Sequence, residues 1–557
     1  MIIGRAISTC CVAVLLFTAT LAAAGSDVAD AAMKADKVAV RALLQKKADV
    51  NAPQTDGATA LHWAVWQEDV EMTALLIRAG ANANAANRQG ATPLSLASTN
   101  GNAAIVVELL KAGVSPNAPL SPYGDTALMM ASRTGKPDAV KVLLDGGAEV
   151  NAKETWGGTT ALMWAAAEGH SAVAAMLVAR GADPNVRSKI VPPPLRRGDG
   201  NMLGYAPREL KPNETSESLV NGRELNVLTA SGGLTPLMFA AREGDMDTVR
   251  ILVEAGADLN IAAAGDLSSA LGLAILNGSF ELASFLVDKG ADIHHADVNG
   301  CTPLWLAVHA RNHDFSVGIP WIVTADPLFL IEKLLAAGAD PNHRIKAAPP
   351  YRKNNASSGS PWLDYAGATA FLRASAAGDL TGMRLLLKYG ADPKIPTADN
   401  LSPLGAASGI GHMGGHSKEW SRSQRVEAVK FLLDLGASVD AADGTGRTPL
   451  HGAAYIGYTE LVQLLVDAGA RLDAKDKGGS TDSDEPLIPL DYAIGVRLFT
   501  AASPVHQPEA EALILKMMAE RGIEHTTSEC TLRGFTCGEK NPKGAPVVMT
   551  PTPTPDR

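Results

Sequence analysis

A short motif recurs along most of the chain and constrains its fold more than any other feature. Thr or Ser, then Ala or Pro, then Leu or Phe starts a new copy every 33 or 34 residues wherever the chain is uninterrupted. The copies begin at Thr59, Thr92, Thr126, Thr160, Thr235, Ser269, Thr302, Thr369, Ser402 and Thr448, with a degenerate copy at Ile488. Such a period is typical of stacked units, each of which buries its apolar face against its neighbours. The sequence therefore predicts a solenoid.

Each copy carries the signals of two short helices. Thr or Ser caps a free N–H at a helix start, and Pro fits the first helical position, where no N–H is needed. A Gly-Ala-Asp or Gly-Ala-Asn element, as at Gly181 and Gly390, follows the Thr by 21 residues. Its Gly ends the second helix in the left-handed region, and the polar residues after it turn the chain into a short finger. The predicted fold class is all-α.

Two segments resemble the Thr-Pro-Leu-His-x-Ala signature of the ankyrin repeat family. They are Ala60-Leu61-His62-Trp63-Ala64 and Thr448-Pro449-Leu450-His451-Gly452-Ala453. The resemblance covers most of residues 28–520 and implies an ankyrin-type helix-turn-helix solenoid with short β-hairpin fingers. It also implies that His62 and His451 are structural and link neighbouring repeats by hydrogen bonds.

The repeat pattern also defines a domain organisation. The solenoid is expected over 26–525, with irregular capping repeats at 26–51 and 489–520. Segments rich in Pro, Gly, Ser or charge interrupt it and are expected to be surface loops. These insertions are 186–232, 313–326, 343–366, 410–424 and 475–485. A C-terminal tail, 526–557, follows the solenoid.

The N-terminus has the features of an export signal. Arg5 precedes the apolar stretch Cys11–Phe17, and Ala22-Ala23-Ala24 offers a small-residue cleavage site before Gly25. We expect a signal peptide over 1–24, a periplasmic or secreted protein, and no stable membrane insertion after cleavage. An uncleaved membrane anchor is the alternative. Cys530 and Cys537 could form a disulfide in an oxidising compartment, or remain free thiols.

Charge and motifs narrow the classes of function. The net charge of −10 disfavours a general nucleic-acid binder. The sequence contains no nucleophile elbow, no zinc-protease motif and no phosphate-binding loop, so we expect neither an enzyme nor a cofactor. Two alternatives stay open. One is a metal-handling periplasmic protein that uses His412, Met413 and His416. The other is a hydrolytic enzyme whose site is formed by the insertions.

The resemblance also implies where a partner would bind. Ankyrin proteins usually contact partners through finger tips and the exposed end of the first helix. The matching residues in this chain are Trp66, Gln67, Arg88, Tyr123, Arg133, Trp156, Arg242 and Tyr455. Trp, Tyr and Arg dominate the energetics of protein interfaces. We therefore expect a monomeric scaffold that binds a protein through its concave face, better equipped in its first half, unless some of these aromatics pack under neighbouring fingers.

Overall fold

The structure is a computed structural model that describes residues 26–191, 231–312, 326–347, 365–411, 420–478, 486–495 and 506–525. It divides into two compact units. Unit 1 contains the described residues up to Gly265, and unit 2 contains those from Asp266 onward. Helices in the described ranges are too short or too polar to cross a membrane. The expected signal peptide (1–24), the tail (526–557) and most of each insertion lie outside the described residues.

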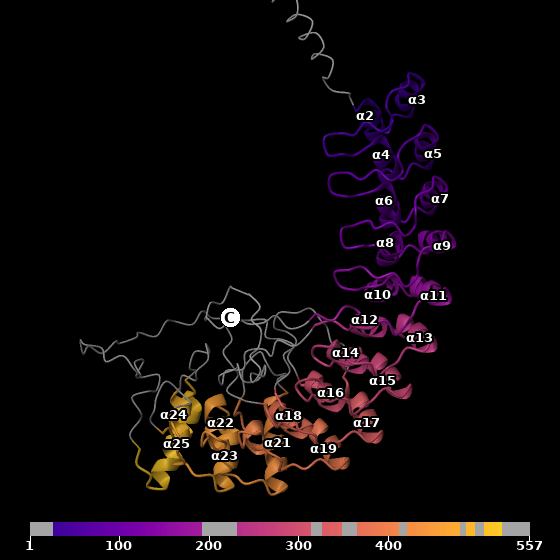
Figure 1. Cartoon of the computed structure of the whole chain (residues 1–557). Coiled ribbons are helices and arrows are strands. Elements are labelled where there is room, and N and C mark those ends of the chain that lie inside the picture. Colours follow the sequence, from indigo (N-terminus) through magenta and orange to yellow (C-terminus); the bar gives the residue numbers. More distant parts are fainter. Residues whose placement is uncertain are drawn as a thin grey trace, which may run out of the picture. The chain divides into compact units, whose positions relative to one another are not determined.

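Unit 1 is a stack of helix pairs. Its first helices are α2 (Asp27–Met33), α4 (Ala60–Trp66), α6 (Pro93–Asn100), α8 (Ala127–Arg133), α10 (Ala161–Ala167) and α12 (Pro236–Glu243). Its second helices are α3 (Lys37–Gln45), α5 (Val70–Arg78), α7 (Ala103–Lys111), α9 (Pro137–Asp145), α11 (Ser171–Ala179) and α13 (Met246–Glu254). Figure 1 shows the first helices in one row, the second helices in another, and the fingers projecting from the first row.

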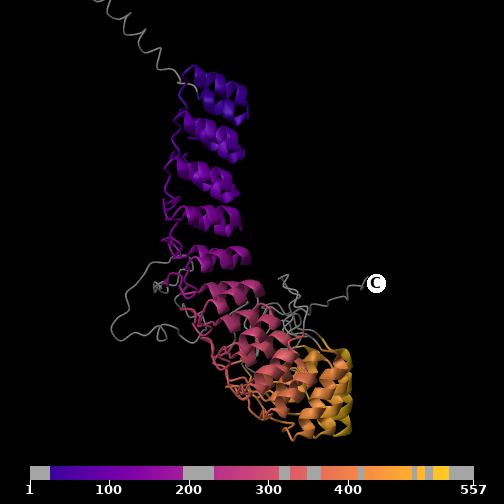
Figure 2. The ribbon, with the colours of Figure 1, turned by 90° about the vertical axis from the view of Figure 1, so that its right-hand side faces the viewer.

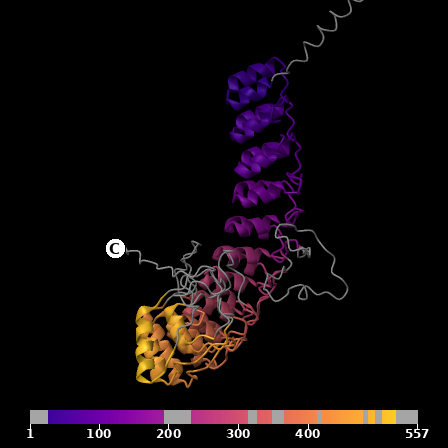
Figure 3. The same cartoon turned by 90° about the vertical axis from the view of Figure 1, so that its left-hand side faces the viewer.

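Unit 2 repeats this arrangement. Its first helices are α14 (Ala270–Leu276), α16 (Pro303–Arg311), α18 (Ala370–Ala377), α20 (Pro403–Ala407), α22 (Pro449–Ile456) and α24 (Pro489–Ile494). Its second helices are α15 (Phe280–Asp288), α17 (Leu328–Ala336), α19 (Leu380–Lys388), α21 (Arg422–Asp434), α23 (Thr459–Asp467) and α25 (Pro508–Glu520). Figure 2 shows these pairs packed pair on pair, and Figure 3 shows them from the opposite side.

The Thr or Ser of the motif stands at the start of the first helices from α4 to α22, as the sequence predicts. Thr126 caps α8 by accepting a hydrogen bond from the backbone N–H of Met129 at 3.3 Å, and Thr160 caps α10 in the same way. Several second helices use a carboxylate or amide cap. At the start of α5, for example, Asp69 accepts a hydrogen bond from the backbone N–H of Met72 at 3.0 Å. Satisfying these N–H groups stabilises helices that are too short to persist alone.

In the core of unit 1, small apolar residues lie on the first helices and large ones on the second helices. The motif places an Ala in the middle of each first helix, where it is fully buried: Ala64, Ala97, Ala131, Ala165 and Ala240. The second helices contribute buried Leu at matching positions: Leu76, Leu109, Leu143, Leu177 and Leu252. Because Ala lets first helices approach closely while Leu fills the space behind them, every pair packs on the next in the same register.

The signature histidines join neighbouring repeats, as the family resemblance implies. The His62 Nδ1 accepts the backbone N–H of Thr59 at 3.1 Å, which fixes the tautomer so that Nε2 donates to the Ala91 carbonyl at 3.0 Å in the next repeat. His451 makes the corresponding bonds to Thr448 and to the Leu487 carbonyl. Burial lowers the pKa of both rings, that of His451 to about 4, so both stay neutral at pH 7.

The β-hairpins expected in the fingers are absent from the described residues. The backbone N–H of Asn87 donates to the Ala91 carbonyl at 3.0 Å, but the N–H of Ala91 returns to the side-chain oxygen of Asn87 at 2.9 Å. An antiparallel pair needs both bonds between backbones. The side chain takes the second bond, so each finger is closed by a turn. One isolated antiparallel bridge, between Val191 and Ser231, is the exception in these ranges.

Asparagine side chains connect the bases of successive fingers. Asn151 donates from Nδ2 to the Gly181 carbonyl at 3.0 Å and accepts at Oδ1 from the N–H of Asp183 at 2.9 Å. Asn185 makes the same two bonds to Gly256 and Asp258, although far more residues separate these partners in sequence. The stack of unit 1 therefore continues in register across the position where the chain is interrupted.

Candidate binding surface

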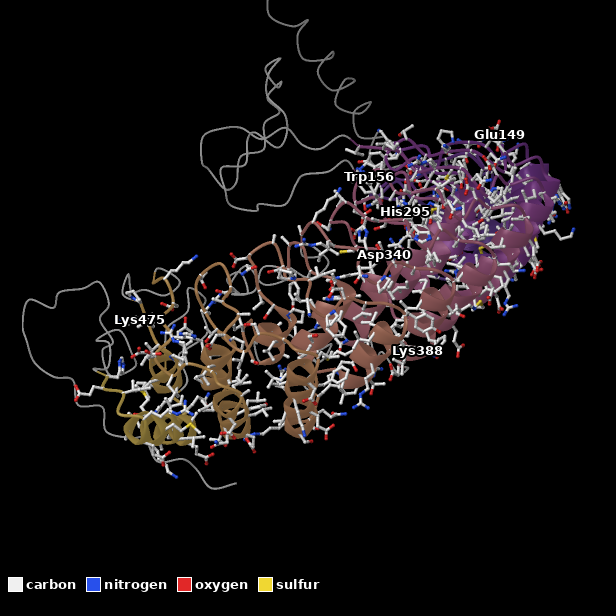
Figure 4. The ribbon with its side chains drawn as sticks, turned by 90° about the horizontal axis from the view of Figure 1, so that it is seen from below. Glu149, Trp156, His295, Asp340, Lys388 and Lys475 are labelled. Carbon is white, nitrogen blue, oxygen red and sulfur yellow. The ribbon has the colours of Figure 1, made fainter. Side chains whose placement is uncertain are left out.

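Two aromatic side chains stand on successive finger tips of unit 1. Tyr123 is 56% exposed and Trp156 is 76% exposed. Their fingers are joined at the tips, because the backbone N–H and the side-chain hydroxyl of Thr155 both donate to the Tyr123 carbonyl, at 2.6 and 2.9 Å. Figure 4 shows Trp156 on the side of unit 1 that carries the finger segments. The two rings are thus presented on one edge of the stack.

The finger of Trp156 is held by a buried carboxylate. Glu154 is only 5% exposed. Its oxygens accept from the N–H groups of Trp156 at 2.6 Å and Thr159 at 2.8 Å, and from Gly157. Burial raises the pKa of Glu154, but these hydrogen bonds outweigh burial and hold the pKa below its usual range. The loop that carries Trp156 is therefore rigid, with the carboxylate ionised at neutral pH.

The next finger adds two exposed aliphatic residues. The backbone N–H of Lys189 donates to the Gly157 carbonyl at 2.7 Å, which places Ile190 and Val191 beside the Trp156 finger. Ile190 is 49% exposed and Val191 is 46% exposed. We call the four residues Tyr123, Trp156, Ile190 and Val191 the fingertip patch. Exposed apolar residues grouped in this way commonly mark interaction sites.

The backbone behind Ile190 and Val191 is fixed where the chain leaves and rejoins the stack. Val191 and Ser231 exchange two backbone hydrogen bonds of 2.9 Å. Gly232 follows at φ +88°, and a Cβ added there would lie 1.9 Å from the Lys189 carbonyl oxygen. Only glycine allows the returning chain to pass this close, so the third finger of the patch is also preorganised.

Exposed cations surround the fingertip patch. Lys153, Arg187 and Lys189 are all exposed. The Nζ of Lys153 lies 3.1 Å from the Arg187 carbonyl oxygen, and that of Lys189 lies 3.1 Å from the Thr155 carbonyl oxygen. Arg187 likewise donates to backbone carbonyls. No carboxylate among the described residues pairs with these three side chains, so their charge is available to a partner.

Trp66 and Gln67 lie at a different edge of unit 1. They stand at the C-terminal end of α4, whereas the fingers enter the first helices at their N-terminal ends. Trp66 is 59% exposed. Gln67 is half-buried, and its Nε2 donates to the Met33 carbonyl at 2.8 Å, so this side chain already fastens the capping pair to the first full repeat. The structure does not group these two residues with the fingertip patch.

The predicted arginines are exposed and partly engaged. The guanidinium of Arg133 lies 4.7 Å from the ring centre of Trp164, and Arg242 donates to Glu243 at 3.0 Å. Both are at the C-terminal ends of first helices, as Trp66 is. Arg88 is on a finger, and its backbone N–H donates to the Asp56 carbonyl at 2.9 Å. Arg88 alone of the three is a finger residue like those of the patch.

Tyr455 belongs to unit 2 and is half-buried. Burial raises the pKa of its phenol, and its backbone carbonyl accepts a hydrogen bond from Gln507 of the C-terminal repeat at 3.3 Å. Tyr455 therefore takes part in packing α22 against the end of the stack, and it is not on the same compact unit as the other predicted contact residues.

The residues of the alternative metal-handling hypothesis, His412, Met413 and His416, lie outside the described residues, as do Cys530 and Cys537. Within the described ranges, no group of three His, Cys, Asp or Glu side chains is arranged to hold a metal ion. Cys301 is a buried free thiol.

Unit 2 contains a buried polar cluster that sequence reasoning missed. Arg311 and Asp379 are 3% and 1% exposed and pair at 2.7 Å. Asn312 donates to the same carboxylate at 3.2 Å and accepts from Trp420 at 2.9 Å. Asp379 also caps α19 through the N–H of Gly382. Hydrogen-bond donors surround the Asp379 carboxylate, and the cluster connects the end of α16 to the starts of α19 and α21. Its role is therefore structural.

The sequence contains few signals that identify the structural roles of Arg311, Asp379 and Glu154. Arg311 and Asp379 are 68 residues apart, so no local motif contains both. Glu154 stands where other fingers use Asn or Asp, as Asn87 and Asp297 do. The usable signal was the repeat length, which is 34 residues from Thr92 to Thr126 and again to Thr160, against 33 from Thr59 to Thr92. The added residue falls in the fingers that carry Tyr123 and Trp156.

Comparison with known proteins assigns the family. Models described as ankyrin repeats match residues 28–119, 113–188 and 205–297, and a second ankyrin model matches 421–494. Among solved structures, the ankyrin repeat domain of Bcl-3, titled a unique member of the IkappaB protein family, is similar with 26% identity. That match covers 45% of this chain and 94% of the other at a TM-score of 0.34. No curated protein matches the sequence. The matched repeats span more than half of the chain, which belongs to the ankyrin repeat family, a family of protein–protein interaction scaffolds.

Proposed function

We propose that this chain is an exported scaffold that binds a protein partner along the finger side of unit 1. The observation that carries the proposal is Trp156, an indole 76% exposed on a backbone fixed by Glu154 and by the neighbouring finger. A large exposed aromatic side chain has no stabilising role in the monomer, and Trp is the residue type most enriched among interface hot spots. Because its loop is already ordered, binding would cost little additional conformational entropy.

The first helices of unit 1 support a concave face next to the fingers. Half-buried large side chains recur along this row: Trp63, Leu96, Met130, Trp164 and Phe239. In unit 2, by contrast, every residue of α18 and α20 is buried. The described surface that could accept a partner's apolar side chains is therefore richer in unit 1, which favours unit 1 as the binding half.

Export rests on the N-terminal pattern. Arg5, the apolar stretch Cys11–Phe17 and the small residues Ala22 to Ala24 support cleavage before Gly25 and a periplasmic or secreted location. We also propose that the free protein is monomeric, since both ends of the repeat array have atypical repeats of the capping kind.

The binding proposal is tested by quantitative capture. The purified full chain is immobilised, incubated with an envelope extract of its native source, and the retained proteins are identified and measured. Trp156→Ala combined with Tyr123→Ala should weaken retention of the specific partner by about tenfold or more, as expected when a hot spot is truncated. Trp66→Ala, measured separately, reports whether the other edge of unit 1 contributes.

Phe329→Ala is the matched control, because Phe329 is also an exposed aromatic residue, 44% exposed, but lies in unit 2. Circular dichroism melts establish that the variants remain folded. If the Tyr123 and Trp156 variant retains every captured protein as well as the Phe329 control does, the finger side of unit 1 is not the binding surface.

A further inference from the structure

We propose that the fingertip patch recognises an extended acidic segment of a protein partner, in which apolar side chains recur about every third residue with carboxylates between them. This inference rests on the proposed function and specifies the chemistry of the partner.

The charge around the patch is opposite to that of the whole chain. The chain carries a net charge of −10, yet the exposed ionic groups next to the patch are Lys153, Arg187 and Lys189. Glu149 and Asp183 are exposed, but they lie at the finger bases, where their backbone N–H groups bond to Asn117 and Asn151. Two further acids lie nearer the finger tips. Glu154 is buried and saturated by backbone N–H groups, and Asp125 is half-buried and accepts from Ser121. Among the described residues, the solvent-facing charge at the finger tips is therefore positive, which steers an acidic ligand to the tips and disfavours a basic one.

The cations are also poised to accept a carboxylate. Lys153 and Lys189 contact only backbone carbonyl oxygens among the described residues, at 3.1 Å each. A neutral carbonyl attracts an ammonium group less strongly than a carboxylate does. Each ammonium can keep its carbonyl contact and still donate to a carboxylate, because it has three N–H donors. Binding would therefore add charge-assisted hydrogen bonds without breaking an existing ion pair.

The spacing of the fingers sets the spacing of the ligand. Tyr123, Trp156 and the Ile190–Val191 pair occupy three successive fingers, joined by the bonds from Thr155 to Tyr123 and from Lys189 to Gly157. Packed helices are about 8–10 Å apart, and a ligand in the extended polyproline II conformation advances about 3.1 Å per residue with three residues per turn, so that every third side chain points in the same direction. One finger therefore corresponds to roughly three residues of an extended ligand, so its apolar side chains would meet successive fingers and its acids would meet Lys153 and Lys189.

An anionic membrane is the competing ligand for such residues, because Trp, Ile and Lys also suit a lipid headgroup region. The linear order of the patch, with one apolar site on each of three joined fingers, favours an extended peptide over a broad lipid surface. Vesicles are therefore included as an arm of the test.

The test measures binding of defined probes to the full chain by fluorescence anisotropy. The main probe is a fluorescein-labelled peptide with Leu at every third position and Glu elsewhere. Two control peptides replace every Glu by Lys, or every Leu by Ser. We expect saturable binding of the main probe and at least about tenfold weaker binding of both control peptides. High salt should weaken binding of the main probe, because it screens the charges.

The matched variants change charge at fixed positions. Lys153→Glu with Lys189→Glu should weaken the main probe about tenfold or more, whereas Lys153→Arg with Lys189→Arg should stay within about twofold. Lys153→Gln with Lys189→Gln keeps donors for both carbonyls and serves if the reversal does not fold. The inference is overturned if the main probe does not bind, if the Lys-containing peptide binds equally well, or if charge reversal has no effect.

Sedimentation with vesicles of phosphatidylcholine and phosphatidylglycerol completes the design. Vesicle binding that charge reversal abolishes, together with no peptide binding, overturns the inference in favour of a membrane. The capture assay separates the two proposals. If Trp156→Ala reduces capture but charge reversal of Lys153 and Lys189 does not, the proposed binding surface is retained and the proposed acidic partner segment is overturned. If neither change reduces capture, both proposals are overturned.

Discussion

Single imidazole rings span two repeats in this protein, and their chemistry makes the stack sensitive to acid. His451 is fully buried, accepts the Thr448 N–H at Nδ1 and donates from Nε2 to the Leu487 carbonyl. A second proton, on Nδ1, would point at the N–H of Thr448 and would abolish the hydrogen bond by which the ring caps that group. His62 has the same arrangement with Thr59 and Ala91. The neutral ring is therefore the form compatible with the fold.

The pKa of His451, lowered to about 4 by burial, yields a prediction with a definite sign. An unfolded His has a pKa of about 6.5, so between pH 6.5 and 4 the unfolded chain binds a proton that the folded chain does not. The contribution of His451 to stability is intact above pH 6.5 and falls by up to about 3 kcal/mol as the pH drops to 4.

Urea unfolding at a series of pH values measures this effect. His451→Gln, which cannot titrate, should be less stable at pH 7 but should show a shallower loss of stability between pH 6.5 and 4. A pH dependence equal to that of the unmodified chain would show that His451 does not titrate as its burial implies.

At the scale of the repeat, side-chain amides carry much of the connection between neighbouring fingers. Asn151 and Asn185 each make two hydrogen bonds to the turn that ends the following helix pair. Asn84 holds the equivalent place, 33 residues before Asn117, but its side chain makes no hydrogen bond to the described residues of the next repeat. The chain therefore contains both a bonded and an unbonded copy of the same position.

This pair supplies a matched prediction. Asn151→Ala removes both bonds and leaves the Gly181 carbonyl and the Asp183 N–H to solvent, so it should destabilise unit 1 by about 1–2 kcal/mol. Asn84→Ala should cost a few tenths of a kcal/mol at most. Denaturant unfolding of the two variants gives the comparison, and equal losses would mean that the amide bridges contribute nothing beyond the local turn.

Much of the fold could be predicted from the sequence because its signals are local. Thr126 and Thr160 lie next to the helices they cap, and Gly181 lies next to the helix it ends, so a repeating pattern identifies the elements. The prediction of β-hairpin fingers was wrong. It depended on whether the N–H of Ala91 bonds to the backbone carbonyl or to the side-chain oxygen of Asn87, and the sequence does not show which acceptor is used.

The candidate site was predictable in part. Tyr123 and Trp156 were identified by their place on the fingers, and both are exposed. The neighbouring Ile190 and Val191 were not identified, since they become adjacent to Trp156 only through the bond from Lys189 to Gly157. Gln67 was predicted to face a partner, but its contact is with Met33, which is 34 residues away. Contacts between repeats, unlike helix caps, depend on stacking geometry.

At the scale of the whole molecule, the proposed export has a simple test. Intact-mass measurement of the protein from its native source should give a chain that begins at Gly25, because Ala22 and Ala24 provide the small residues that a signal peptidase requires. A disulfide between Cys530 and Cys537 would make that chain two hydrogens lighter. Retention of residues 1–24 would support an uncleaved anchor and contradict the proposed processing.

The paired backbones of Val191 and Ser231 have a consequence for how such a protein changes over evolution. The two ends of the interruption meet in a two-bond contact, while Asn185 bridges directly to Gly256 beyond it. The entropy of closing a loop grows only slowly with its length. Segments of very different size could therefore be exchanged at this junction with little effect on the solenoid, which makes it an acceptor site where new sequence can be acquired, or a foreign domain grafted, beside the finger tips.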